Sequence, residues 1–295
     1  MKNFIEIAFG SKKINIQNIC NKKFGKQKSN LILSKTGPKF IKICNSNENS
    51  LTLAIKAFIK LKNKNKKINF KNLIFVTENN IRNYPGNSFL FASKCNLSEE
   101  LNLFDINSGC TGFVDAIKLA DKFKDNTLIV CSETYSKNIS QFQRNVSTLF
   151  SDAAAVFFYD KNKFKVINEK SGYKKNTYDF ITSKNKNLTM NGKKVFDFVR
   201  TVVKPQLSNH LKLNKSKSIK KIFIHQASKV IIDYFKILFK NKYIIPTNIV
   251  KRGNTVSATI PVLIFDNIKH FKNEIILCGF GVGLSYSIIT LKIND

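Results

Sequence analysis

Cys110 lies in a segment whose residue types suit nucleophilic chemistry. The segment, residues 107–112, reads NSGCTG and joins a predicted strand that ends near Ile106 to a predicted amphipathic helix. The dipole at a helix N-terminus favours an anion, so we expect Cys110 to be a thiolate. Gly109 and Gly112 permit a sharp turn and close approach of a substrate. The motif alone is also compatible with a small buried cysteine that caps a helix.

His225 and Asn254 are two further residues that could act in an active site. His225 directly follows the apolar residues 222–224 and precedes a predicted helix near Ser228, at a strand end where α/β folds bind ligands. Asn254 lies in a turn, KRGNT, that leads into a helical segment. Taken singly, each has a structural explanation, namely a hydrogen-bonded histidine and a helix cap or left-handed residue.

The sequence predicts no cofactor and no metal. The glycine-rich residues 279–283 lie between two predicted strands, whereas a nucleotide fingerprint needs a strand followed by a helix. We interpret them as a tight bend that lines a pocket. The cysteines show neither a C-x-x-C pair nor ligand spacing, which indicates reduced thiols in a cytoplasmic protein. They are Cys20, Cys44, Cys95, Cys110, Cys131 and Cys278.

Short apolar runs alternate with helical patterns, which is typical of an α/β layered fold. Two helices are expected from buried-face spacing, one with Phe113, Ala116, Ile117 and Ala120, the other with Val230, Ile231, Tyr234, Phe235 and Leu238. The predicted strands are Leu73 to Val76, Leu101 to Ile106, Thr127 to Cys131, Ala154 to Tyr159, Ile222 to Ile224, Ile275 to Cys278 and Ser285 to Ile293.

Two polar stretches are interpreted, one as part of the surface and the other as the boundary between two halves of the chain. Residues 60–71, rich in Lys and Asn, are predicted to be a solvated helix end and loop. Residues 170–187 are rich in Lys, Asn, Ser and Thr and fall between the first and second sets of strands. We therefore predict two halves, residues 1–170 with the cysteine and residues 171–295 with the histidine and asparagine.

The composition indicates a compact globular protein with an excess of positive charge. The chain has 295 residues, is 43% hydrophobic and carries a formal net charge of +31. Neither an arginine-rich recognition helix nor an aromatic RNA-binding signature accompanies that charge, so no specific nucleic-acid partner is expected. We expect the charge to steer acidic proteins or phosphorylated carriers. The sequence has neither a signal peptide's apolar core nor a run long enough for membrane insertion.

Together, these motifs resemble the 3-oxoacyl-(acyl-carrier-protein) synthase III family of the thiolase superfamily along nearly the whole chain. Residues 104–113 resemble its nucleophile segment, IHQA at 224–227 its histidine motif and GNT at 253–255 its asparagine motif, in the family's order. Supporting matches are residues 34–37, 132–136, 150–155, 190–196 and 279–283.

The resemblance implies an α/β thiolase fold, with two similar halves in a five-layered arrangement, and a homodimer. It implies that Cys110 takes an acyl group from a thioester of coenzyme A or acyl carrier protein. The backbone N–H groups of Cys110 and Val282 would form the oxyanion hole. His225 and Asn254 would then donate hydrogen bonds to malonyl-acyl carrier protein, which loses carbon dioxide and attacks the acyl group. No acidic residue stands in either motif to deprotonate an acetyl group directly.

Several positions depart from the family's pattern, mostly where substrates are delivered. Leu31 occupies the place of a Trp that lies beside the coenzyme A adenine in many relatives. Val230 and Asp197 stand where basic residues are usual, and Val282 stands where a glycine is usual. We therefore predict a specialised thioester or carrier, with Lys229 and Lys236 as candidate carrier-binding residues.

Two other functions stay open from sequence. One is acyl transfer from Cys110 to an oxygen or nitrogen acceptor without decarboxylation. The other is a catalytically silent basic binding protein on a thiolase fold, because a fold alone does not fix function.

Overall fold

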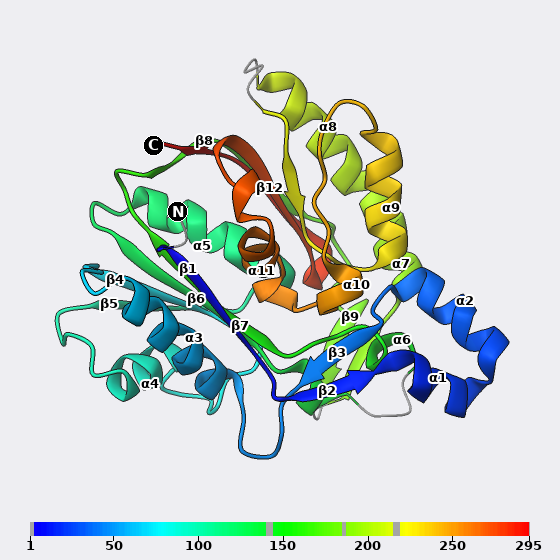
Figure 1. The fold of residues 1–295 in the computed structure, drawn as a ribbon. Helices are drawn as coiled ribbons and strands as arrows, with labels where there is room; N and C mark the ends of the chain where they lie inside the picture. The colour runs from blue at the N-terminus through cyan, green and yellow to red at the C-terminus, as the bar shows by residue number, and fades with distance from the viewer. Residues whose placement is uncertain (1–2, 140–143, 185–186, 215–218, 295) are drawn as a thin grey trace.

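The chain folds around two β-sheets in the computed structural model (Figure 1). The structure describes residues 3–139, 144–184, 187–214 and 219–294. Within these residues, the first sheet has five strands in the order β1 (Ile5–Phe9), β7 (Ala153–Tyr159), β6 (Thr127–Glu133), β4 (Asn72–Val76) and β5 (Asn102–Ile106). The pairs β6–β4 and β4–β5 are parallel, so their carboxyl ends meet at one edge.

The second sheet carries the C-terminal strands. Its order is β11 (Ile222–Ile224), β12 (Asn273–Gly281), β13 (Ser285–Ile293) and β8 (Phe164–Tyr173). β11 and β12 are parallel, whereas β12–β13 and β13–β8 are antiparallel. Two small antiparallel sheets pair β2 (Lys12–Asn15) with β3 (Phe40–Ile43), and β9 (Ile181–Lys184) with β10 (Asn187–Met190).

The α-helices lie outside and between these sheets. They are α1 (Ile16–Phe24), α2 (Lys26–Thr36), α3 (Ser50–Lys64), α4 (Asn87–Lys94), α5 (Gly112–Lys122), α6 (Arg144–Ser147), α7 (Gly192–Phe198), α8 (Lys204–Leu213), α9 (Lys229–Leu238), α10 (Ile249–Arg252) and α11 (Thr259–Asp266). A π-helical segment, Val199–Val203, joins α7 to α8.

Side-chain alternation along the second sheet shows how the layers are stacked. Phe223 of β11 and Leu277 of β12 point into a core shared with α5, α11 and the first sheet. Their neighbours Ile224 and Cys278 point the other way, into a core shared with α8 and α9. Helices α5 and α11 therefore lie between the two sheets (Figure 1), with α3 and α4 outside the first sheet and α8 and α9 outside the second. The predicted five-layered α/β arrangement is confirmed.

Each segment predicted as a strand is a strand, with ends shifted by a few residues at most. The first predicted helix is also confirmed, because Phe113, Ala116, Ile117 and Ala120 are all buried on α5. The polar residues 60–71 form the end of α3 and the loop after it, as predicted.

The predicted buried face of α9 is partly wrong. Ile231 and Phe235 are buried, as expected, but Val230 and Leu238 are exposed. Ile232, which lies outside the predicted face, is buried instead. Helical spacing gives the width of the apolar stripe but not which of its edges meets the neighbouring layer.

The predicted boundary between residues 170 and 171 falls within β8, a strand that already belongs to the second sheet. The division of the chain into two halves stays a prediction.

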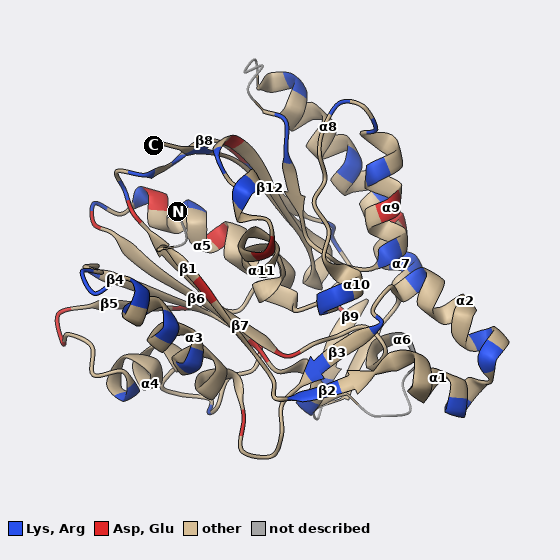
Figure 2. Cartoon of the chain, in the orientation of Figure 1, with Lys and Arg blue, Asp and Glu red and all other residues tan. Residues whose placement is uncertain are grey.

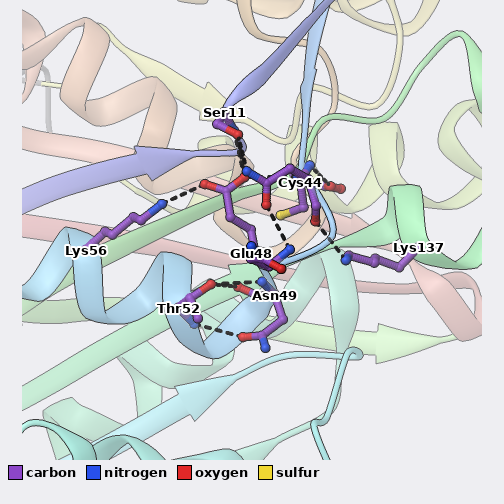
Figure 3. Close-up of polar contacts among 10 residues, drawn as sticks. Ser11, Cys44, Glu48, Asn49, Thr52, Lys56 and Lys137 are labelled. Carbon is purple, nitrogen blue, oxygen red and sulfur yellow. Dashed lines mark hydrogen bonds and ion pairs between the residues drawn. The ribbon is translucent and has the colours of Figure 1, made fainter.

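Glu48 fixes the loop between β3 and α3 (Figure 3). One of its carboxyl oxygens accepts hydrogen bonds from the backbone N–H and the hydroxyl of Ser11, at 2.9 and 2.8 Å, and the other pairs with Lys56 at 2.6 Å. Burial alone would raise the pKa of Glu48, but hydrogen bonds from Lys56, Ser11 and Asn45 lower it to about 2. Asn49 and the third helical residue form a capping box at the start of α3. These contacts fix the loop to Ser11 and to the start of α3.

Positive charge is spread over many elements (Figure 2). Lys and Arg lie on the outer helices and on connecting segments of both sheets, without a single basic stripe in this view. Among the described residues, no helix is both long enough and apolar enough to cross a membrane.

Candidate active site

Cys110 lies in a short 3-10 turn, Gly109–Thr111, between β5 and α5. Gly109 has φ of +47°, a left-handed conformation that favours glycine. The start of α5 is pressed against β4, because a β-carbon on Gly112 would lie 2.4 Å from a methyl carbon of Val76. The two glycines thus place a buried cysteine between the end of a strand and the start of a helix, as the sequence predicted. This position lies at the carboxyl edge of the parallel strands.

The end of β12 passes directly over the sulfur. A β-carbon on Gly281 would lie 2.7 Å from the Cys110 Sγ, and one on Gly279 would lie 2.8 Å from the Cys110 carbonyl oxygen. After Gly281 the chain turns through Val282–Leu284 into β13. The predicted tight bend is therefore confirmed, and it lines the cavity around Cys110.

The surroundings of Cys110 oppose the thiolate that a helix N-terminus would favour. Burial raises the pKa of the Cys110 thiol well above its usual range, and Glu78 and Glu133 raise it further where they are ionised. Hydrogen bonds from the backbone N–H groups of Val282 and of Cys110 itself lower the pKa by less. Both N–H groups nevertheless lie against the sulfur, where an oxyanion hole would need them.

Substitution of Gly281 tests whether acylation needs the close contact between the end of β12 and the Cys110 sulfur. We expect Gly281→Ala to slow acylation of Cys110 on the order of a hundredfold, because the added methyl group displaces the nucleophile or the Val282 N–H. The control is Ser46→Ala, at an exposed residue that does not line the cavity. The measurement is the rate of mass gain from an acyl thioester. Equal rates in Gly281→Ala and the wild type would contradict the close contact.

His225 directly follows β11 and is held by the sheet. Its backbone N–H donates to the carbonyl oxygen of Cys278 at 2.9 Å, and its ring packs edge-on against Phe280, with ring centroids 5.5 Å apart. Burial lowers the pKa of His225 to about 3, so the ring is neutral at pH 7. Its Nδ1 atom is buried and has no hydrogen-bond partner within the described part of the chain. A neutral imidazole with an unused nitrogen is suited to hydrogen bonding a ligand.

The side-chain amide of Asn254 is held in one orientation. Its Oδ1 accepts hydrogen bonds from the Val256 N–H at 2.9 Å and the Thr259 hydroxyl at 3.2 Å. The Nδ2 group is therefore left as a donor, and one of its two hydrogens contacts the Ala227 carbonyl oxygen at 3.3 Å. The backbone of Asn254 pairs with Leu149 and Ser151, which ties this turn to the segment just before β7.

Cys110, His225 and Asn254 line one cavity of about 70 Å³. Cys110 precedes His225 by more than a hundred residues, whereas His225 and Asn254 both lie in the connection between β11 and β12. The rest of the wall is mostly apolar, with Phe150, Phe280 and Val195 among its members. An apolar wall around a thiol, a neutral histidine and an amide donor suits acyl-group chemistry on sulfur.

Two carboxyl groups near Cys110 were missed from the sequence. Glu78 lies two residues after β4, the strand that pairs with β5, and Glu133 ends β6, which pairs with the other edge of β4. The Glu78 N–H donates to a Glu133 carboxyl oxygen at 3.1 Å, and both carboxyl oxygens of Glu78 lie 2.9 Å from where a Gly109 β-carbon would be. Burial raises the pKa of Glu78 to about 7 and that of Glu133 well above its usual range. Their place at the carboxyl ends of parallel strands was the signal that could have found them.

The two candidate carrier-binding residues lie on α9, outside this cavity. Lys229 begins the helix, forms an ion pair with Asp233 one turn later, and packs near Gly37 at the end of α2. Lys236 is exposed near the other end of α9. Their role in carrier binding stays a prediction.

Comparison with known families agrees with this arrangement. The profile of 3-oxoacyl-[acyl-carrier-protein] synthase III matches residues 104–172, and the profile of its C-terminal part matches residues 212–293. These segments hold Cys110 in the first match and His225 and Asn254 in the second.

Individual relatives cover most of the chain. The chain is 31% identical to the β-ketoacyl-[acyl-carrier-protein] synthase III of Enterococcus faecalis over 220 residues, 64% of this chain and 67% of that protein. It is 29% identical to the Clostridium botulinum protein of the same name over 269 residues, 78% of this chain and 80% of that one. The crystal structure of a 3-oxoacyl-(acyl-carrier protein) synthase from Burkholderia xenovorans has the same fold. Its TM-score is 0.87 at 21% identity, over 99% of this chain and 93% of that one.

Proposed function

Because this chain belongs to the 3-oxoacyl-[acyl-carrier-protein] synthase III family, we propose that it condenses an acyl group on Cys110 with a malonyl thioester, releasing carbon dioxide. The observation that carries this proposal is the meeting of Cys110, neutral His225 and the Asn254 amide in one apolar cavity.

The first step is transfer of the acyl group to Cys110. The sulfur attacks the thioester carbonyl carbon, the carrier's carbon–sulfur bond breaks, and the carrier thiol leaves with the proton. The N–H groups of Cys110 and Val282, which already face the sulfur, stabilise the negative oxygen of the tetrahedral intermediate. The raised pKa of Cys110 means that the thiol must lose its proton as the substrate binds or reacts.

The second step needs two neutral hydrogen-bond donors. His225 and Asn254 donate to the thioester oxygen of the malonyl group, where charge develops as carbon dioxide leaves. The resulting enolate attacks the acyl carbon, and the Cys110 thiolate is released with a 3-oxoacyl product. Because decarboxylation supplies the carbanion, no base is needed to remove a carbon-bound proton. The low pKa of His225 keeps the ring a neutral donor throughout.

Its partners follow from this reaction. We infer an acyl thioester of coenzyme A or acyl carrier protein as donor and malonyl-acyl carrier protein as extender, as in fatty-acid or specialised acyl-chain synthesis. Lys229 and Lys236 are the candidate contacts for an acidic carrier, supported by the excess of positive charge. A cytoplasmic homodimer is expected by analogy with the family.

Carbon dioxide release tests the proposal directly. We expect label to be released from a carboxyl-labelled malonyl thioester in proportion to the acyl groups that Cys110 has taken up. The control omits the acyl donor and establishes the background of uncoupled decarboxylation. Loss of the acyl group to an oxygen or nitrogen acceptor without label release would support simple acyl transfer instead. No acylation by any donor would indicate a silent binding protein.

A further inference from the structure

A second, larger chamber adjoins the cavity at Cys110. Its volume is about 460 Å³, against about 70 Å³ for the cavity that holds the sulfur. The two spaces share three lining residues, Tyr135, Ile181 and Val282. The two spaces therefore share one wall, and Glu78 of the larger space also lies against Gly109, the residue before Cys110.

The chamber is polar, in contrast to the apolar cavity of Cys110. Most of its described lining residues carry hydrogen-bonding side chains, among them Glu78, Asn107, Asn138, Thr182 and Ser183. A chamber for a plain alkyl chain is expected to be lined by hydrophobic side chains, because polar groups lose hydrogen bonds to water when an alkyl chain covers them.

Glu78 supplies the only carboxyl group among the described residues that line this chamber. It accepts a hydrogen bond from the Tyr135 hydroxyl and lies against the turn that presents Cys110. No Lys or Arg in the described part of the chain forms an ion pair with Glu78 or with Glu133. This is notable in a chain with 50 Lys and Arg residues against 19 Asp and Glu. A carboxyl group has further acceptor positions beyond the one that Tyr135 uses.

We propose that the acyl group received by Cys110 carries a hydrogen-bond donor, a hydroxyl or an amino group, that binds Glu78 in this chamber. The inference rests on the proposed acylation of Cys110 and names the substrate class. An unsubstituted alkyl chain would cover Glu78 and its polar neighbours without replacing their hydrogen bonds to water.

The test compares acyl thioesters of coenzyme A that match in size. At the shorter length these are 3-hydroxypropionyl, 3-aminopropionyl and butyryl groups, and at the longer length 5-hydroxypentanoyl, 5-aminopentanoyl and hexanoyl groups. The measurement is kcat/KM for mass gain at Cys110. We expect a hydroxyl or amino thioester to react about tenfold faster or more than its alkyl isostere, at one length or both. Comparison of the hydroxyl thioesters with the amino thioesters identifies which of the two donor groups Glu78 binds.

Variants of Glu78 test whether this residue causes the preference for a hydroxyl or amino thioester. Glu78→Leu is expected to remove it and to favour the alkyl isostere, while the control Glu100→Leu, at a side chain 79% exposed on another loop, is expected to keep it. If Glu78→Leu does not fold, the wild-type comparison decides alone. Alkyl thioesters that react as fast as their polar isosteres at both lengths would overturn the inference but leave the proposed acylation standing. A preference that survives Glu78→Leu would also overturn it. Absence of mass gain with every donor would overturn both.

Discussion

Cys110→Ser is expected to abolish formation of the acyl-enzyme. His225 cannot activate a serine hydroxyl here, since burial lowers the pKa of the ring to about 3 and leaves it a poor proton acceptor. A thiol ionises far more readily than a hydroxyl and its sulfur is the better nucleophile, even with a pKa raised by burial. Intact mass after incubation with an acyl thioester measures the effect.

A matched control separates loss of the nucleophile from loss of the fold. Cys95→Ser alters a half-buried cysteine on the far side of the first sheet from the cavity lining, and it is expected to acylate like the wild type. A mass gain in Cys110→Ser equal to that of Cys95→Ser would show that another residue accepts the acyl group.

Loss of either His225 or Asn254 is expected to spare acylation and depress condensation, on the order of a hundredfold or more. Alanine at either position removes one of two donors that face the malonyl thioester oxygen. The oxyanion hole for acylation consists of the backbone N–H groups of Cys110 and Val282, which these substitutions leave in place. The measurement compares the acylation rate with the rate of labelled carbon dioxide release in the same variant.

Two further variants sharpen this prediction. Asn254→Asp keeps the acceptor that binds Val256 and Thr259 but replaces the Nδ2 donor with an oxygen, so we expect condensation to fall as in Asn254→Ala. His210→Asn alters a buried histidine that bonds Thr290 at 2.9 Å and does not line the cavity, and condensation should persist. Normal condensation in His225→Ala would show that His225 is not an enolate donor.

Strands and helices were easiest to predict where their apolar residues repeat with the period of the element. The apolar runs of the two main sheets and the periodic face of α5 needed only local information, because strands and buried helices repeat with fixed periods. The face of α9 was misplaced at Val230 and Leu238, since its burial depends on how the helix docks onto the second sheet.

The electrostatics of the site depend on contacts between distant segments. The motif at residues 107–112 indicated a cysteine at a helix N-terminus, but not the two carboxyl groups that the neighbouring strands bring beside it. Glu78 and Glu133 are 55 residues apart in sequence and are joined by one hydrogen bond in the fold. Burial, together with these two groups, raises the Cys110 pKa where the helix N-terminus alone would lower it.

The central claim is that Cys110 carries the acyl group that is condensed with malonate-derived carbon. Peptide mapping of the acylated protein, before and after addition of a malonyl thioester, tests it most directly. We predict that the acyl mass lies on the peptide containing Cys110 and disappears on addition of the malonyl thioester, with one carbon dioxide released for each acyl group lost. An acyl mass on another cysteine, or one that stays on Cys110 while carbon dioxide is released, would contradict the account.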